Sequence, residues 1–126
     1  MTIKSPIINI MTKAAYKAGN KLIKDFREVE NLQVSKKGVG DFVSTADFNS
    51  EETIINELQK FYPNIDIIAE ETNPNISDNK SEKKFLVDPL DGTLNFLHGL
   101  PHFSISIALM YKEEIISGIV YDPIKD

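Results

Sequence analysis

Apolar residues recur every three or four positions in the first part of the chain, with lysines between them. The repeating positions are Ile7, Met11, Ala14, Ala15, Ala18, Leu22, Phe26 and Val29. This spacing is typical of an amphipathic helix with one buried face. Pro6 suits the first turn of such a helix, where a missing N–H costs nothing. The pattern therefore predicts a helix that opens at Pro6.

A second helical pattern follows a turn at residues 36–40 (KKGVG). Ser44, Thr45 and Asp47 are of the residue types that cap helix N-termini. The apolar positions after them are Phe48, Ile54, Ile55, Leu58 and Phe61. We therefore expect a second helix that begins near Asp47 and ends before Pro63.

The next apolar runs are short and typical of strands. Residues 65–69 (IDIIA) predict a buried strand that delivers Glu70 and Glu71 at its C-terminal end. Residues 85–87 (FLV) predict another strand, which delivers Asp88.

Two further apolar runs close the chain. Residues 103–111 and 115–121 flank the charged segment 112–114 (KEE), and this arrangement predicts an antiparallel hairpin. Helices first and strands after them indicate an α+β fold, with the helices packed on a largely antiparallel sheet.

Composition limits the classes of protein to consider. The chain has 126 residues, 41% of them hydrophobic, which predicts one domain over residues 1–126. The net charge is −5 and the pI is near 5.0, so we expect no nucleic-acid partner and no anionic membrane partner. Cysteine is absent, which excludes disulfides and thiolate sites and is consistent with the cytoplasm. No apolar run is long enough to span a bilayer.

Candidate metal ligands are concentrated in the segment Asp88-Pro89-Leu90-Asp91. A strand that ends in one aspartate and reaches a second after a proline can bring two carboxylates and the Leu90 carbonyl to one point. Hard cations prefer such oxygen ligands. The segment therefore predicts a site for a divalent metal ion.

An anion site is predicted beside it. Gly92 allows close approach of the backbone, and Thr93 supplies a hydroxyl. A helix starting near Asp91 would direct free N–H groups at an anion. Metal and anion sites together indicate metal-assisted phosphoester chemistry.

Each signal also has an ordinary explanation. The segment 88–92 is typical of a solvated turn, and Glu70 with Glu71 is typical of surface charge. His98 and His102 are four residues apart, but the intervening glycine and proline make a helical metal pair improbable, so we interpret both as structural or surface residues. The apolar side chains around them are expected in the core: Phe96, Leu97, Leu100, Phe103, Ile105 and Ile107.

The combination of motifs is more specific than any one of them. Residues 69–72 (AEET), 88–93 (DPLDGT) and 95–99 (NFLHG) follow one another in the order and spacing of the inositol monophosphatase family, and residues 41–47 (DFVSTAD) resemble its first acidic motif. The resemblance implies the layered αβαβα sugar-phosphatase fold, of which this chain matches the first half.

The resemblance also implies the metal ligands. Glu70, Asp88 and the Leu90 carbonyl would bind a first Mg²⁺, and Asp88 and Asp91 would bind a second. Asp88 would therefore bridge the two ions. Such a pair can polarise a phosphoryl group and activate water.

The same resemblance implies catalytic roles. Thr93, oriented by Asp47, would position the attacking water together with Glu70. The backbone amides of Gly92 and Thr93 would hold the substrate phosphate. The implied activity is Mg²⁺-dependent hydrolysis of inositol monophosphate, or of a similar sugar or polyol phosphate, to alcohol and phosphate.

One family motif is missing from the sequence. The second half of family members carries a Trp-Asp-x-Ala-Ala-Gly motif that completes the site, and this chain has no tryptophan. We therefore expect a phosphatase of this family in a truncated, split or partial form. Two alternatives stay open: a catalytically silent Mg²⁺- or phosphate-binding module, and an interaction fragment. An unpaired strand at residues 115–121 would also favour a homodimer or aggregates.

Overall fold

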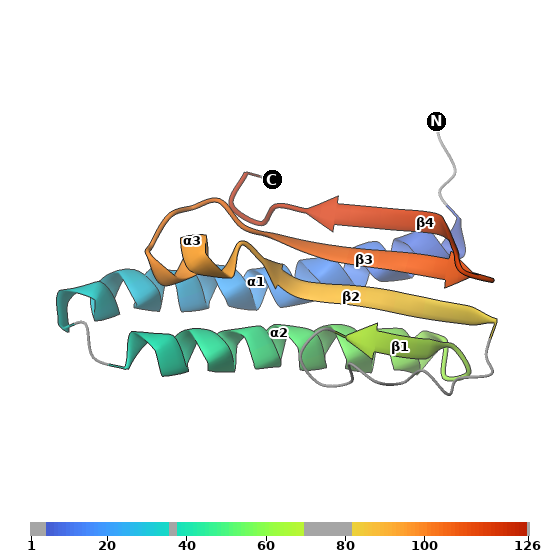
Figure 1. The fold of residues 1–126 in the computed structure, drawn as a ribbon, viewed down its shortest axis with the longest axis horizontal. Helices are drawn as coiled ribbons and strands as arrows, with labels where there is room; N and C mark the ends of the chain where they lie inside the picture. The colour runs from blue at the N-terminus through green and yellow to red at the C-terminus, as the bar shows by residue number, and fades with distance from the viewer. Residues whose placement is uncertain (1–4, 36–37, 70–81, 126) are drawn as a thin grey trace.

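The computed structural model describes residues 5–35, 38–69 and 82–125. Figure 1 shows helices and strands that follow one another along the chain in the order expected for an α+β fold, which confirms the predicted fold class. The elements are α1 (Pro6–Ser35), α2 (Val39–Phe61), β1 (Asp66–Ala69), β2 (Lys83–Asp91), α3 (Thr93–Leu97), β3 (Ser104–Tyr111) and β4 (Glu114–Tyr121).

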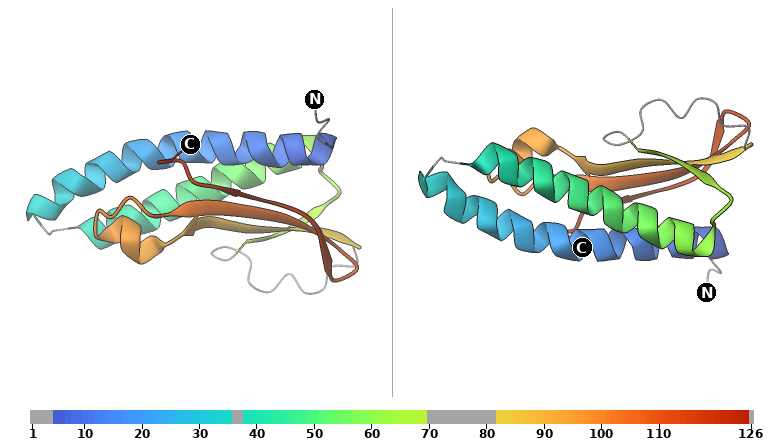
Figure 2. Two further views of the ribbon diagram at one scale, coloured as in Figure 1. Left: turned by 90° about the horizontal axis from the view of Figure 1, so that it is seen from above. Right: turned by 90° about the horizontal axis from the view of Figure 1, so that it is seen from below.

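The two long helices lie side by side on one face of the sheet (Figure 2). α1 begins at Pro6, as predicted, and its repeating apolar positions from Met11 to Val29 are buried. It contacts β3 and β4, while α2 contacts β2. Because each helix buries one stripe against the sheet, the fold has a helical layer and a strand layer.

The second helix begins earlier than predicted. It starts at Val39, after Gly38 in a left-handed conformation, and not near Asp47. The Thr45 hydroxyl donates to the Asp41 carbonyl oxygen (3.0 Å), a bond made within a continuing helix. Asp47 lies on the buried face and is only 8% exposed. Cap-type residues therefore serve the helix interior here, and only the end before Pro63 is confirmed.

The strands form one sheet in the order β1-β2-β3-β4. β1 and β2 are parallel, and the other pairs are antiparallel, as the sequence indicated for most of the sheet. β2 is longer than the predicted residues 85–87 and includes both aspartates of the motif. β3 and β4 form the predicted hairpin, turning at Lys112 and Glu113, which both have positive φ as two-residue hairpin turns require.

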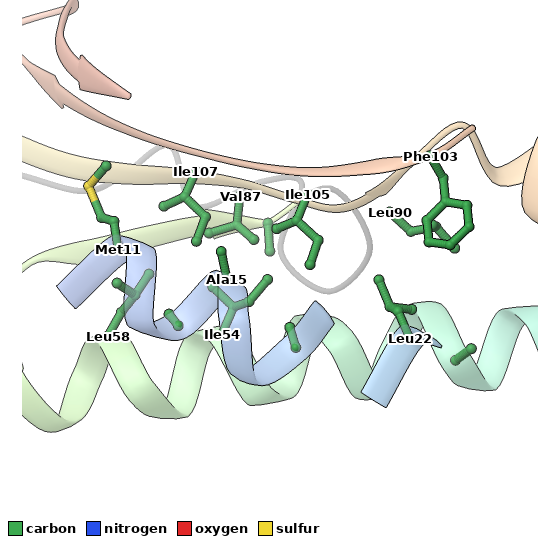
Figure 3. Packing of buried hydrophobic residues seen from close by; sticks show 14 of the residues in the cluster. Met11, Ala15, Leu22, Ile54, Leu58, Val87, Leu90, Phe103, Ile105 and Ile107 are labelled. Carbon is green, nitrogen blue, oxygen red and sulfur yellow. The ribbon is translucent and has the colours of Figure 1, made fainter. Parts of the chain in front are cut away.

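The hydrophobic core lies between the helices and the sheet. Figure 3 shows Met11, Ala15 and Leu22 from α1 facing Val87, Ile105 and other apolar side chains of the strands. At one end, three aromatic rings pack together, with centroids 4.9 to 5.5 Å apart: Phe26, Phe96 and Phe103.

The core prediction for Leu100 is wrong. Leu100 is 49% exposed, because it lies in the connection between α3 and β3 and not in an element with a buried face.

β4 forms an edge of the sheet, and its outer side chains are exposed. They include Ile115, Ile116 and Val120. Among the helices that the structure describes, none is long and apolar enough to cross a lipid bilayer.

Candidate active site

A β-bulge at the end of β2 orients the two aspartates of the motif. Asp88 pairs with Ser106 and Asp91 with Ser104, so three steps along β2 match two along β3. In a regular strand, residues three apart point to opposite faces of the sheet. The extra residue cancels this alternation. Asp88 and Asp91 therefore share one face, the face opposite the helices.

The two residues between them point the other way. Pro89 and Leu90 are both buried, and Figure 3 shows Leu90 directed into the core. A bulge tolerates Pro89, which has no N–H to donate to the sheet. The Ser50 hydroxyl on α2 donates to the Pro89 carbonyl oxygen (2.8 Å), so this buried acceptor is satisfied by a helix. The bulge is thus fixed from the core side.

The oxygen atoms at the bulge differ in their surroundings. Asp88 is half-buried, and its Oδ1 accepts a hydrogen bond from the Leu90 N–H (3.4 Å). Asp91 is exposed, and no lysine, arginine or histidine of the described segments forms an ion pair with it. The Leu90 carbonyl oxygen accepts a bond from the Thr93 hydroxyl (3.1 Å) and keeps a second lone pair.

The chain turns sharply after Asp91. Gly92 has φ +95°, and a Cβ there would lie 2.8 Å from the His102 carbonyl oxygen. The predicted helix follows as α3, but it has only five residues, Thr93–Leu97. A helix this short contributes little dipole, so the predicted anion site would depend on individual N–H groups.

The expected partner of Thr93 is Asp47. It lies on the buried face of α2, and α2 contacts α3. The Thr93 hydroxyl donates to the Leu90 carbonyl oxygen. An orienting role of Asp47 toward Thr93 therefore stays a prediction.

One predicted ligand lies outside the described residues. Glu70 follows β1, whose last residue, Ala69, pairs with Val87 immediately before Asp88. Within residues 5–35, 38–69 and 82–125, no three Asp, Glu or His side chains converge in a way that could hold a metal ion. The complete predicted cluster therefore stays a prediction, and the bulge places Asp88 and Asp91 on one face of the sheet.

Two polar contacts at the site were not predicted. The first is the Ser50 bond to Pro89, and the second is a bond from Asn95 Nδ2 to the His102 carbonyl oxygen (2.8 Å). A polar stripe on α2 (Asp47, Ser50 and Glu51) was the available signal for the first. The sequence indicated Asn95 only as part of the motif at residues 95–99. Its bond could not be predicted, because the partner is a backbone atom that no side-chain pattern reveals.

An open hollow of about 290 Å³ adjoins the turn. The residues that line it are Asp91, Gly92, Asn95, His102, Phe103, Ser104, Asp122 and Lys125. Polar groups thus surround a space next to the exposed carboxylate of Asp91.

Comparison with known families matches the sequence of this chain to one of them. The inositol monophosphatase family model matches residues 3–126. The chain belongs to the inositol monophosphatase family. The resemblance found in the motifs is therefore confirmed.

Curated relatives within the family carry two kinds of name. The chain is 47% identical over 123 residues to an inositol-1-monophosphatase of Mesorhizobium japonicum. It is 43% identical over 122 residues to a protein of Haemophilus influenzae named Nus factor SuhB. These matches cover 98% and 97% of this chain but 46% and 45% of the relatives, so the chain spans about half their length.

Solved structures of the family show the same fold. The SuhB protein of Bartonella henselae superposes with a TM-score of 0.82 at 43% identity, over 97% of this chain and 46% of that one. The inositol monophosphatase of Anabaena superposes with a TM-score of 0.76 at 30% identity, over 94% and 40%.

Proposed function

We propose that this chain provides the metal- and phosphate-binding half of a Mg²⁺-dependent phosphomonoesterase. The substrate would be inositol monophosphate or a similar sugar or polyol phosphate. The observation that carries the proposal is the bulge at the end of β2, which places Asp88 and Asp91 on one face beside the Gly92 turn. Membership in the inositol monophosphatase family supports the choice of reaction.

The donor atoms at the bulge suit Mg²⁺. Asp88, Asp91 and the Leu90 carbonyl are oxygen ligands, which this hard cation prefers, and Glu70 would add a carboxylate. A net charge of −5 with no ion pair on Asp91 in the described segments leaves negative charge for a cation to neutralise. When bound, Mg²⁺ would neutralise phosphate charge and lower the pKa of water.

The remaining residues would bind and orient. The backbone amides of Gly92 and Thr93 would hold phosphate oxygens, because the glycine leaves the backbone accessible. The Thr93 hydroxyl and the Glu70 carboxylate would position the attacking water, with Asp47 supporting Thr93. Water held in line with the phosphorus atom reacts faster because its orientation no longer costs entropy.

Phosphate release from inositol 1-phosphate in Mg²⁺ tests this proposal. We expect little turnover by the 126-residue chain alone, since it spans about half of its relatives. Turnover should appear when the second half of the Mesorhizobium japonicum relative is added. Asp88→Asn should abolish it, whereas His98→Ala, at an exposed position beyond α3, should not.

The alternatives predict other outcomes. Full turnover by the chain alone would show that the site is complete without a second half. Failure of every second half to restore turnover, with Mg²⁺ still bound, would favour a silent binding module.

A further inference from the structure

We infer that Asn95 is a positioning residue that fixes the turn formed by Asp91, Gly92 and Thr93. It acts by holding the backbone carbonyl of His102 against Gly92. The inference rests on the proposed function, because the turn it fixes is the proposed phosphate site.

Asn95 joins α3 to the loop that leads into β3 through two bonds. Its side-chain Nδ2 donates to the His102 carbonyl oxygen (2.8 Å). Its own carbonyl oxygen accepts a bond from the Leu100 N–H (2.8 Å). The loop is closed further by a bond from the His102 N–H to the Leu100 carbonyl oxygen (2.8 Å). One residue of α3 thus bonds to the loop at two points, one of them the His102 carbonyl.

The same carbonyl packs directly on the turn. The His102 oxygen lies 2.8 Å from the position that a Cβ on Gly92 would take, and Phe103 Cα lies 3.3 Å from it. Gly92 therefore has the loop backbone against one side of its Cα. A shift of the loop by a fraction of an ångström would change the space in which Gly92 and its neighbours sit.

Contacts of Phe96 and Thr93 also hold this region. Phe96 is buried between Phe26 and Phe103, and the Thr93 hydroxyl bonds to the Leu90 carbonyl oxygen. Asn95 is on the outer side and lines the hollow next to Asp91. Its amide is therefore placed to fix the turn on the side where a phosphate would enter.

Two substitutions remove the bond while the rest of α3 is kept. Asn95→Asp preserves the size of the side chain but replaces the N–H donor by an oxygen, which would face the His102 oxygen. Asn95→Ala removes the group altogether. Leu94→Ala is the matched control, because Leu94 is the neighbouring residue in α3 and is 70% exposed.

The experiment measures binding of inorganic phosphate to the full chain in Mg²⁺ by calorimetry. We expect both Asn95 variants to raise the phosphate Kd by about fivefold or more, the size expected for one lost hydrogen bond. Leu94→Ala should leave it unchanged. Wild-type affinity in Asn95→Asp would overturn the inference.

Amide hydrogen exchange provides a second readout that does not depend on ligand binding. Exchange in both Asn95 variants should rise in residues 91–103 and stay at the wild-type level in β4. Exchange that rises throughout the chain, or nowhere, would overturn the positioning role. If wild-type protein binds no phosphate, the proposed function fails. The exchange pattern still tests whether Asn95 fixes the turn.

Discussion

Asp25 on α1 is an acidic side chain in an unfavourable position. It is half-buried, and within the described segments its Oδ2 atom has no hydrogen-bond partner. Burial raises the pKa of this carboxyl, and Glu28 raises it further, although Lys21 partly opposes the change. A carboxyl whose pKa is higher in the folded state costs stability when it is ionised.

Asp25→Asn should therefore stabilise the protein at pH 7, by less than about 1 kcal/mol, because Asp25 is partly exposed and solvent screens its charge. The gain should shrink as the pH falls and wild-type Asp25 becomes protonated. Urea unfolding at several pH values measures this, with Asp41→Asn at an exposed position as the control. A gain that stayed constant with pH would contradict the electrostatic explanation.

Glu57 on α2 shows the opposite shift. Its Oε2 accepts a hydrogen bond from Lys17 (2.8 Å), and Lys13 lies 3.6 Å from Oε1. The hydrogen bond from Lys17 is the largest cause that holds the pKa of Glu57 below its usual value. Burial raises the pKa and so opposes this shift. The charges of Lys17, Lys13 and Lys60 lower the pKa further. The stabilisation is therefore present above the unfolded pKa and is lost as the pH falls through the folded pKa.

Glu57→Gln should make the unfolding free energy less dependent on pH in the acidic range. At neutral pH the loss should be at most about 1 kcal/mol, because both lysines are half-exposed. The unfolding free energy of wild type and variant should converge below the folded pKa of Glu57. A difference that persisted at low pH would show that packing, and not charge, links the two helices here.

At the scale of elements, the aromatic cluster anchors α3. Phe96 is fully buried and contacts the rings of Phe26 on α1 and Phe103 before β3. Phe96→Ala should lower the unfolding free energy by about 3–5 kcal/mol, as for other buried aromatic truncations. Phe48→Ala, at an exposed position on α2, should cost far less. Equal losses in the two variants would mean that α3 is not held by the cluster.

The edge strand β4 carries the second prediction at this scale. Val120 is 75% exposed, and an apolar edge can pair with another chain. We expect the 126-residue chain to form dimers or larger species in light scattering, and Val120→Lys to reduce them. A monodisperse wild-type monomer at high concentration would contradict this expectation.

The elements show what sequence patterns can and cannot predict. The start of α1 and the hairpin followed from periodicity and turn residues alone. The start of α2 did not, because Thr45 and Asp47 have the same polarity whether they cap a helix or lie within it. The bulge in β2 could not be predicted either, since it depends on pairing with β3 and on the distant Ser50 hydroxyl.

At the scale of the whole molecule, the candidate site lies where the strand layer turns into α3. The motif order in the sequence identified Asp88, Leu90, Asp91, Gly92 and Thr93 as neighbours of a site. The sequence predicted that the two carboxylates can meet, but it could not show the bulge that puts both aspartates on one face of the sheet. The support from Asn95 through the His102 carbonyl is likewise a product of tertiary packing.

Melting temperature in Mg²⁺ and in chelator tests the central claim most directly, which is that the bulge holds a divalent cation. In wild-type protein, millimolar Mg²⁺ should raise the melting temperature, because ligand binding stabilises the folded state. Asp91→Asn should lose that increase, and Asp41→Asn should keep it. The same melting temperature in Mg²⁺ and in chelator, with no difference between wild type and Asp91→Asn, would contradict the metal site.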